Sequence, residues 1–124
     1  MSQKPTVYVI DDDAAVRDSI CLLLETTGFT VCSYASGADF LREAPAQDSG
    51  CLLVDLDMPG MTGLDLLGRL RQRRKTIPAI IMTGGVTPTI RSDAQRVAAQ
   101  VLEKPFRARE LMGCIETALG RYRA

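Results

Sequence analysis

Residues 51–63 read CLLVDLDMPGMTG, and this stretch decides the fold. Its apolar run leads directly into Asp55, and Asp57 follows two positions later, just before a Pro-Gly turn. Successive side chains of a strand point to opposite faces of a sheet, so an unbroken apolar run is typical of a strand covered on both faces. We therefore predict a buried strand at 51–55 that ends in a carboxylate.

Short apolar runs of this kind alternate with longer amphipathic segments along the rest of the chain. Five strand–helix units in succession predict an α/β fold, a doubly wound five-stranded parallel sheet with helices on both faces. The strands are expected at 6–10, 30–34, 51–55, 78–83 and 100–103. The helices are expected after the first strand as far as Gly28, through about Glu43 with Ser36 as its cap, after the third strand with Thr62 as its cap, at 86–98 with an interruption at Pro88, and at 107–122.

Size and composition fit one soluble domain that spans residues 1–124. The chain is 46% hydrophobic and 24% charged, and its 15 basic residues balance its 15 acidic residues. This neutral balance argues against nucleic-acid binding that depends on bulk charge. No apolar stretch reaches the roughly 18 residues of a membrane span, and the opening residues MSQKPT lack the apolar segment of a signal peptide. We therefore expect a cytoplasmic location, with no membrane and no direct nucleic-acid binding by this domain.

The cysteine and histidine content disfavours a zinc site. The chain has no histidine, and its four cysteines are scattered without a CxxC pair: Cys21, Cys32, Cys51 and Cys114. A zinc site needs closely spaced thiolates or imidazoles. We interpret the cysteines as small buried hydrophobic residues in a reducing compartment.

Polar residues collect at the carboxyl ends of the expected strands, where ligands bind in doubly wound sheets. Clustered carboxylates repel one another unless a cation lies among them, and hard oxygen ligands favour Mg²⁺. A lysine and a threonine beside that metal suit a phosphoryl group, so the set predicts phosphoryl transfer onto or off a carboxylate. The set is Asp11, Asp12 and Asp13 after the first strand, Asp55 and Asp57 after the third, Thr83 after the fourth and Lys104 after the fifth.

Each of these residues also has a purely structural interpretation. Asp13 is placed to cap the next helix, and Asp57 before a proline fits turn chemistry. Thr83 fits a β-branched strand end, and Lys104 fits a solvated surface charge. Taken together, these interpretations do not explain why the strand ends, and not the strand starts, carry the whole set.

Four motifs resemble those of the receiver domain of two-component response regulators, the CheY-like family. They are VYVIDDDAAVR at 7–17, LLVDLDMPGMTGLDLL at 52–67, IIMTGG at 80–85 and LEKPF at 102–106. The resemblance covers nearly the whole chain, and the EKPF and TG segments are most similar to the FixJ-type branch. It implies a flavodoxin-like fold with strand order 2-1-3-4-5.

The resemblance also implies a metal site with the roles of its ligands. Asp12 and Asp55 would bind Mg²⁺ through their carboxylates, and Asp11 would act through a water molecule. Asp57 would contribute its backbone carbonyl.

For the phosphoryl group, the resemblance implies three further roles. Asp55 would be the phosphoacceptor, Thr83 the switch hydroxyl, and Lys104 the cation that pairs with the phosphoryl group. The bond between Lys104 and Pro105 would be cis. The new charge would draw Thr83 inward and shift the population between two existing conformations.

As a receiver, the chain would be a signalling module and not an enzyme in the usual sense. It would accept the phosphoryl group from a sensor histidine kinase, promote its own phosphorylation and dephosphorylation only, and control a downstream protein or a transcriptional output domain of a longer regulator. Relatives commonly dimerise through the face built by the fourth helix, the fifth strand and the last helix, so a homodimer is a candidate assembly. Two alternatives are a pseudo-receiver interaction module that never accepts phosphate and, less favoured, a DxD-type phosphatase.

Three segments depart from the simplest pattern. Val101 stands where the switch aromatic of relatives is common, so an aromatic rotamer change is not available. Gly84, Gly85 and Pro88 predict a fourth helix that is short, shifted or mobile. The basic run RLRQRRK at 69–75 is either a contact for nucleic acid or a kinase or, as we favour, a solvated helix end.

Overall fold

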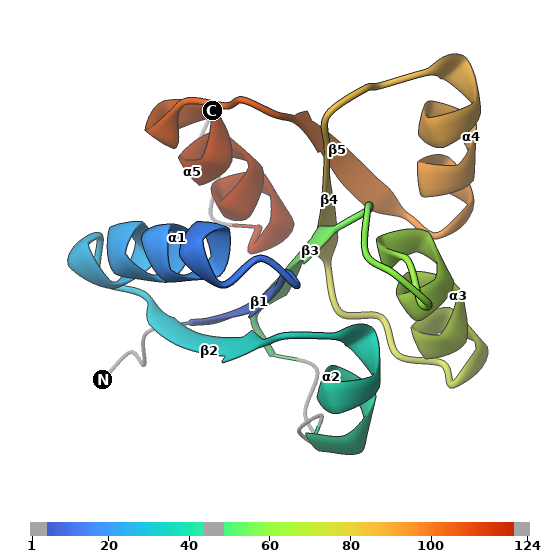
Figure 1. Ribbon diagram of the computed structural model, residues 1–124, viewed down its shortest axis with the longest axis horizontal. Helices are drawn as coiled ribbons and strands as arrows, with labels where there is room; N and C mark the ends of the chain where they lie inside the picture. Colours follow the sequence, from blue (N-terminus) through green and yellow to red (C-terminus); the bar gives the residue numbers. More distant parts are fainter. Residues whose placement is uncertain (1–4, 44–48, 121–124) are drawn as a thin grey trace.

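The computed structural model describes residues 5–43 and 49–120 as five strands that alternate with five helices (Figure 1). The strands are β1 (Thr6–Ile10), β2 (Thr30–Tyr34), β3 (Cys51–Asp55), β4 (Ala79–Thr83) and β5 (Ala99–Glu103). The helices are α1 (Ala14–Thr26), α2 (Gly37–Glu43), α3 (Gly63–Gln72), α4 (Pro88–Arg96) and α5 (Ala108–Ala118). All strand pairs are parallel, and their order is β2-β1-β3-β4-β5. The predicted doubly wound fold and its strand order are confirmed.

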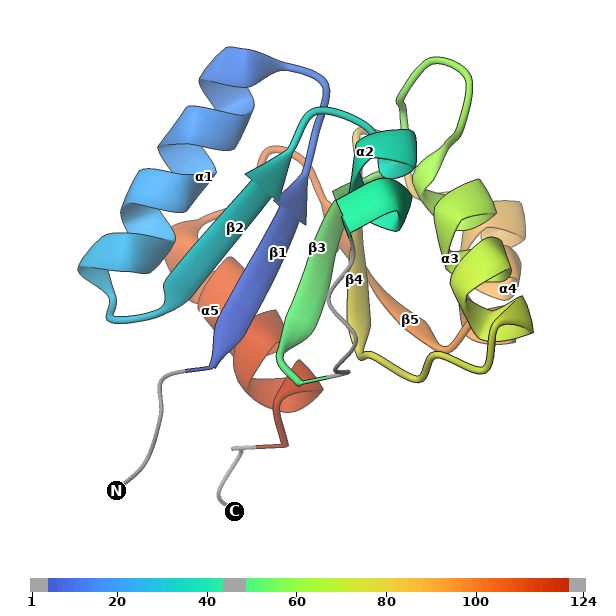
Figure 2. The ribbon, with the colours of Figure 1, turned by 90° about the horizontal axis from the view of Figure 1, so that it is seen from below.

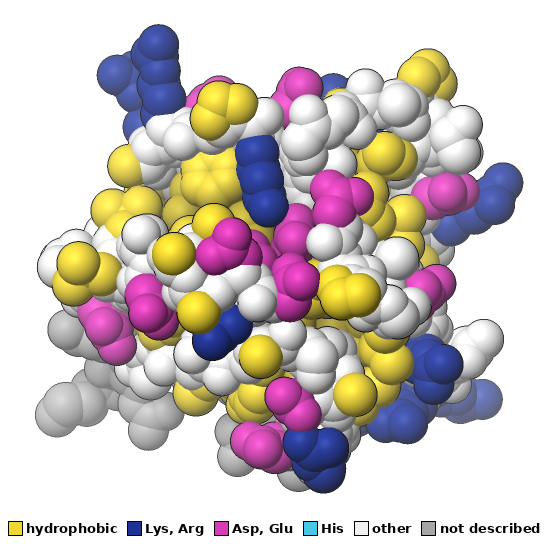
Figure 3. Space-filling model, viewed as in Figure 1, with side chains coloured by type: hydrophobic (Ala, Val, Ile, Leu, Met, Phe, Trp, Pro, Cys, Tyr) yellow, Lys and Arg dark blue, Asp and Glu magenta, His cyan; other side chains and the backbone are white. Residues whose placement is uncertain are grey.

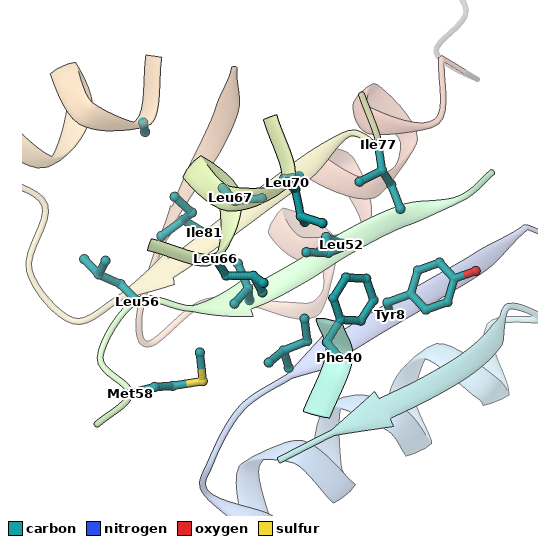
Figure 4. Close-up of a cluster of buried hydrophobic side chains, with 14 residues drawn as sticks. Tyr8, Phe40, Leu52, Leu56, Met58, Leu66, Leu67, Leu70, Ile77 and Ile81 are labelled. Carbon is teal, nitrogen blue, oxygen red and sulfur yellow. The ribbon is translucent and has the colours of Figure 1, made fainter. Parts of the chain in front are cut away.

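The sheet is covered by α1 and α5 on one face and by α2, α3 and α4 on the other (Figure 2). Every residue of β3 and β4 is buried, as the apolar run at 51–55 predicts. Alternate residues of β3 point to opposite faces: Leu53 packs with α1 and α5, whereas Leu52 and Val54 pack with α2 and α3. Figure 4 shows the second of these clusters, with Leu66, Leu67 and Leu70 lying over the strands; the central strands are therefore held rigidly from both sides.

The first helix begins and ends where the sequence predicts. The Asp13 carboxylate accepts hydrogen bonds from the backbone N–H groups of Ala15 and Val16, which would otherwise be unsatisfied at the helix start. Gly28, with φ 102°, follows the end of α1 in the left-handed conformation that glycine adopts without strain. The caps direct the chain from β1 over one face of the sheet and back into β2.

The caps expected for α2 and α3 are also present. The Ser36 hydroxyl accepts from the backbone N–H of Asp39 at 3.0 Å, at the start of α2. At α3 the Thr62 hydroxyl accepts from the N–H of Asp65, whose carboxylate in turn accepts from the N–H of Thr62, both at 3.1 Å. This reciprocal pair is a capping box, which sets where α3 begins after the loop that follows Asp55.

Helix α4 is short, as predicted, but Pro88 does not interrupt it. Pro88 is instead its first residue, and the Thr87 hydroxyl caps the helix by accepting from Ile90 N–H. The prediction of an interruption is wrong because a proline in the first turn removes no intrahelical hydrogen bond and already has the helical φ. The helix therefore begins at Pro88, two residues later than the expected segment.

Other boundaries also differ from those predicted, by one to four residues. Pro78 precedes β4, although its carbonyl accepts from Leu52 N–H at 2.8 Å, and β5 begins one residue earlier, at Ala99. Helix α5 ends at Ala118, and residues 121 and 122 of the predicted helix lie outside the described residues. Val101 in β5 is half-buried against the cluster shown in Figure 4.

The basic run at 69–75 is only partly the solvated helix end that we favoured. Arg69 and Arg73 are exposed, but Arg71 is half-buried. Its guanidinium donates to the backbone carbonyls of Val97 at 2.9 Å, Lys75 at 3.0 Å and Ile77 at 2.8 Å. Arg71 therefore ties the end of α3 to the loop between α4 and β5.

The cysteines are buried less uniformly than predicted. Cys51 is fully buried, and burial raises the pKa of its thiol to about 12. Cys21 and Cys114 are half-buried, whereas Cys32 is exposed on the edge strand β2, so the prediction is wrong for this residue. All four thiols are free. In the part of the chain that the structure describes, no helix is long and apolar enough to cross a membrane.

Candidate functional site

An acidic cluster lies where β1 and β3 end, at the edge of the sheet to which the carboxyl ends of all five strands point. Carboxylate oxygens of Asp11, Asp12 and Asp55 all lie within 4.8 Å of one another. Asp11 and Asp55 are almost fully buried, with exposed fractions of 1% and 4%, whereas Asp12 is exposed. In Figure 3, acidic side chains gather near the middle of the molecular surface that the view shows, beside a basic side chain. The parallel register of β1 and β3 brings together residues that are far apart in the sequence.

Lys104 supplies the positive charge of the site. Its ammonium nitrogen Nζ lies 2.9 Å from Oδ1 of Asp55 and 3.9 Å from Oδ2 of Asp11. Its backbone N–H donates to the carbonyl of Thr83 at 2.8 Å, and the Lys104–Pro105 bond is cis, as predicted. Burial lowers the pKa of Lys104, but the hydrogen bond and the charge of Asp55 outweigh this effect, so that the pKa is raised overall. The lysine is therefore held in its charged form over the carboxylate.

One oxygen of Asp11 lies 3.9 Å from the ammonium of Lys104 but accepts no hydrogen bond from the described residues. Oδ1 of Asp11 accepts from Asp13 N–H at 2.9 Å, but the buried Oδ2 has no hydrogen-bond partner among the described residues. Burial raises the pKa of Asp11, the hydrogen bond from Asp13 opposes this shift, and the charge of Asp55 adds to it. A buried carboxylate oxygen without a partner is costly unless a cation approaches it. The donor set, all carboxylate oxygens, fits a hard divalent cation such as Mg²⁺.

The structure places Thr83 at the end of β4, next to β3 and almost fully buried, with 2% of its surface exposed. Its hydroxyl accepts from Gly85 N–H at 3.3 Å and donates to Gly85 O at 3.4 Å. In the described part of the chain, this hydroxyl is thus engaged with the loop after β4 and not with Asp55. The loop geometry is therefore tied to the position of the Thr83 side chain.

Asp57 does not belong to the carboxylate cluster of Asp11, Asp12 and Asp55, and its side chain is exposed. Its charge nevertheless contributes to the raised pKa of Lys104. The loop that carries Asp57 is closed by two hydrogen bonds to the carbonyl of Leu56, from Met58 N–H at 3.1 Å and from Gly63 N–H at 3.3 Å. The loop therefore folds back over the end of β3.

Gly63 and Arg17 are two residues of the site that sequence reasoning missed. A Cβ atom on Gly63 would lie 2.8 Å from the carbonyl oxygen of Asp55, so only glycine lets α3 start this close to β3. The guanidinium of Arg17 in α1 donates to the carbonyl of Asp11 at 2.6 Å. Arg17 lies in the motif at 7–17 and Gly63 in the motif at 52–67. The pattern of apolar and polar residues around them does not indicate that they approach the carbonyl groups of Asp11 and Asp55.

Comparison with known proteins supports the resemblance to receiver domains that the sequence motifs indicate. Residues 7–116 match the sequence family described as the response regulator receiver domain. The structure is similar to that of FixJ-N, with a TM-score of 0.87, 34% identity and coverage of 100% of this chain and 99% of that chain. It is also similar to full-length FixJ from B. japonicum, with a TM-score of 0.86, 38% identity and coverage of 97% and 60%.

The chain therefore belongs to the response regulator receiver domain family, whose members act in phosphorylation-based two-component signalling. Among curated proteins, it is similar to the transcriptional regulatory protein FixJ of Bradyrhizobium diazoefficiens, with 39% identity over 96% of this chain and 58% of FixJ. It is also similar to the tetrathionate response regulatory protein TtrR of Salmonella typhimurium, with 35% identity over 92% of this chain and 56% of TtrR. The chain thus spans a little over half the length of these relatives.

Proposed function

We propose that Asp55 is the phosphoacceptor of this receiver, that a sensor histidine kinase supplies the phosphoryl group, and that the phosphorylated chain controls a downstream protein or an output domain. The observation that carries this proposal is the ammonium of Lys104 at 2.9 Å from a buried carboxylate at the tip of the central strand. Packing on both faces of the sheet fixes the direction of that carboxylate. A positioned nucleophile beside a cation is the arrangement that phosphoryl transfer requires.

In the transfer step, one oxygen of the Asp55 carboxylate forms a bond to phosphorus as the bond to the donor breaks. The donor is the imidazole nitrogen of a phosphohistidine, which leaves with the electron pair of the broken bond. Lys104 neutralises one phosphoryl oxygen as charge builds on it. Hydrolysis of the resulting acyl phosphate by water returns the carboxylate and releases inorganic phosphate. Both steps form or break a bond at the carboxylate of Asp55.

Asp11, Asp12 and Asp55 would hold Mg²⁺ in this proposal, with Asp11 acting through water and the backbone carbonyl of Asp57 as a further ligand. When bound, the ion would neutralise the negative charges of the carboxylates and of the phosphoryl oxygens. Oδ2 of Asp11, which has no hydrogen-bond partner among the described residues and only the ammonium of Lys104 at 3.9 Å, supports this assignment. Asp12 is the most accessible of the three carboxylates and is exposed to solvent.

Thr83 is the switch residue in this proposal. Its hydroxyl gives up the hydrogen bonds with Gly85 and donates to a phosphoryl oxygen on Asp55, which draws the loop after β4 inward. The negative charge that the phosphoryl group adds thus shifts the equilibrium between two conformations of the region around α4 and β5. Val101 is too small to provide the aromatic rotamer change of relatives, so the response passes through the loop itself.

Intact mass spectrometry after incubation with acetyl phosphate and Mg²⁺ tests the proposal. The unmodified chain is expected to gain the mass of one phosphoryl group, and the gain is expected to disappear in Asp55→Asn. Asp18→Asn is the matched control, because it removes an exposed carboxylate of α1 that lies outside the acidic cluster, and it is expected to retain the gain. A chain that gains no mass under these conditions is the pseudo-receiver alternative, and continuous release of phosphate from a small monoester is the phosphatase alternative.

Addition of Mg²⁺ is expected to stabilise the fold, because the ion relieves repulsion among the carboxylates. A concentration about tenfold above the dissociation constant adds about 1.4 kcal/mol to the free energy of unfolding. For a domain of this size, that gain raises Tm by about 4–7 °C. Thermal unfolding followed by circular dichroism measures the shift, with KCl at equal ionic strength as the control. Asp12→Asn, which alters an exposed ligand, is expected to lose most of the shift, and an equal shift in this variant would contradict the assignment.

A further inference from the structure

The side chain of Arg17 reaches back from α1 to the loop that carries the acidic residues. Its Nη1 donates to the carbonyl of Asp11 at 2.6 Å, and the bond is partly shielded from solvent. The backbone of Arg17 is itself held at the helix start, because its N–H donates to the carbonyl of Asp13 at 2.9 Å. The guanidinium is therefore anchored on a capped helix and contacts the main chain of the site.

This hydrogen bond is one of three that hold Asp11. The backbone N–H of Asp11 donates to Tyr34 O at 3.2 Å, and its Oδ1 accepts from Asp13 N–H at 2.9 Å. With the carbonyl bound to Arg17, Oδ2 is the atom of Asp11 that lacks a hydrogen-bond partner among the described residues. The three bonds thus hold Asp11 in the position in which one of its carboxylate oxygens lies within 4.8 Å of carboxylate oxygens of Asp12 and Asp55.

We propose that Arg17 is a positioning residue for the Mg²⁺ site, an inference that rests on the function proposed above. The carbonyl of Asp11 and the N–H of Asp12 belong to one planar peptide unit, which also includes the Cα atom of Asp12. A donor that fixes this carbonyl therefore also fixes the position of that Cα atom, from which the Asp12 side chain extends. Asp12 is exposed and has little packing to restrain it. The guanidinium therefore sets the spacing between the carboxylates of Asp11 and Asp12 without touching the cation.

The sign of the effect on Mg²⁺ affinity separates positioning from simple charge. Through space, loss of a positive charge near a cation site strengthens cation binding, because repulsion decreases. Loss of a hydrogen bond that orients the ligands weakens cation binding, and such supporting residues typically change metal affinity by about tenfold or more. Arg17→Met removes both the charge and the donor, so the direction of the change reports which effect dominates.

Isothermal titration of the chain with Mg²⁺ at fixed ionic strength provides the test. Arg17→Met is expected to raise the dissociation constant about tenfold. Arg17→Lys, which retains a charged donor, is expected to recover part of the loss. Arg96→Met is the matched control, since it removes an exposed arginine from α4 on the opposite face of the sheet and is expected to bind like the unmodified chain. Should Arg17→Met fail to fold by circular dichroism, Arg17→Ala, which also lacks both the charge and the donor, takes its place.

Two further measurements make the outcome decisive. In the metal-free chain, the ¹⁵N resonance of the Asp12 amide is expected to move in Arg17→Met and to return toward its original position in Arg17→Lys. With acetyl phosphate, Arg17→Met is expected to need more Mg²⁺ for half-maximal phosphorylation and to reach nearly the same maximal rate. Unchanged or tighter Mg²⁺ binding in Arg17→Met overturns the inference alone, whereas absence of Mg²⁺ binding by the unmodified chain overturns the proposed function as well.

Discussion

Lys104→Met is expected to slow phosphorylation by acetyl phosphate about 10²- to 10³-fold, the effect of removing one charge-stabilising donor from a preorganised site. Methionine retains an unbranched side chain of similar length but lacks the ammonium that lies 2.9 Å from Asp55. Without the ammonium, the charge that develops on the phosphoryl oxygens loses one of the two cations that would neutralise it, the other being Mg²⁺. Rates from intact mass spectrometry at saturating Mg²⁺ measure the loss.

Two controls separate the role of Lys104 from a general effect of charge. Arg109→Met removes an exposed cation from α5 and is expected to leave the rate unchanged. Lys104→Arg retains the charge but replaces a compact ammonium with a planar, larger group, and it is expected to recover only part of the rate. A Lys104→Met chain that takes up phosphate as fast as the unmodified chain would show that the lysine does not act on the phosphoryl group.

Gly50→Ala is expected to destabilise the fold by about 3–5 kcal/mol, which is a large part of the roughly 5–15 kcal/mol that stabilises a typical domain. Gly50 has φ 95°, and a Cβ atom there would lie 2.0 Å from the carbonyl oxygen of Thr6. The residue leads into β3 beside the start of β1, so relief of the clash requires the two central strands to move apart. Urea denaturation followed by circular dichroism measures the change.

Gly68→Ala is the matched control for this prediction. Gly68 lies within α3, and a Cβ atom there would meet nothing within 4 Å. Alanine in a helix interior is favoured over glycine by about 0.5–1 kcal/mol, so this variant is expected to be slightly more stable. If Gly50→Ala proved as stable as the unmodified chain, the close approach of Gly50 to Thr6 would not constrain the sheet.

Helix α4 illustrates where prediction from the sequence reached its limit. Glycine and proline around residue 88 predict a short helix, and the helix is short. The same proline was expected to interrupt the helix, because a proline by itself does not reveal whether it lies in the first turn or the interior. The distinction depends on Thr87, which caps the helix, and on Ile90 and Ala94, which pack against the sheet.

The loop that follows α4 shows a second limit. Ala98 has φ 56°, a conformation that alanine adopts only under strain. Its neighbour Val97 offers its carbonyl to Arg71, which lies 26 positions earlier in the chain. The charge of the run 69–75 and its position at a helix end predict solvated side chains, and neither indicates that one of its arginines binds three carbonyl groups.

The sequence by itself determined the strands, the caps of the first three helices and the gathering of polar residues at the strand ends. These features depend on short-range physics: the alternation of side chains along a strand, the hydrogen bonds of Asp13 and Thr62 to nearby N–H groups, and the rule that parallel strands end at one edge. Such signals act over a few residues, so that they can be recognised in a single chain.

Only the tertiary structure decided which atoms meet at that edge. Folding brings Lys104 to Asp55 and Arg17 to the carbonyl of Asp11, places the first residue of α3 against the end of β3, and leaves one oxygen of Asp11 without a hydrogen-bond partner among the described residues. These contacts depend on the close packing of helices against both faces of the sheet, which sets distances to within a fraction of an ångström. Local sequence carries no signal for such distances, because they result from every side chain in the core at once.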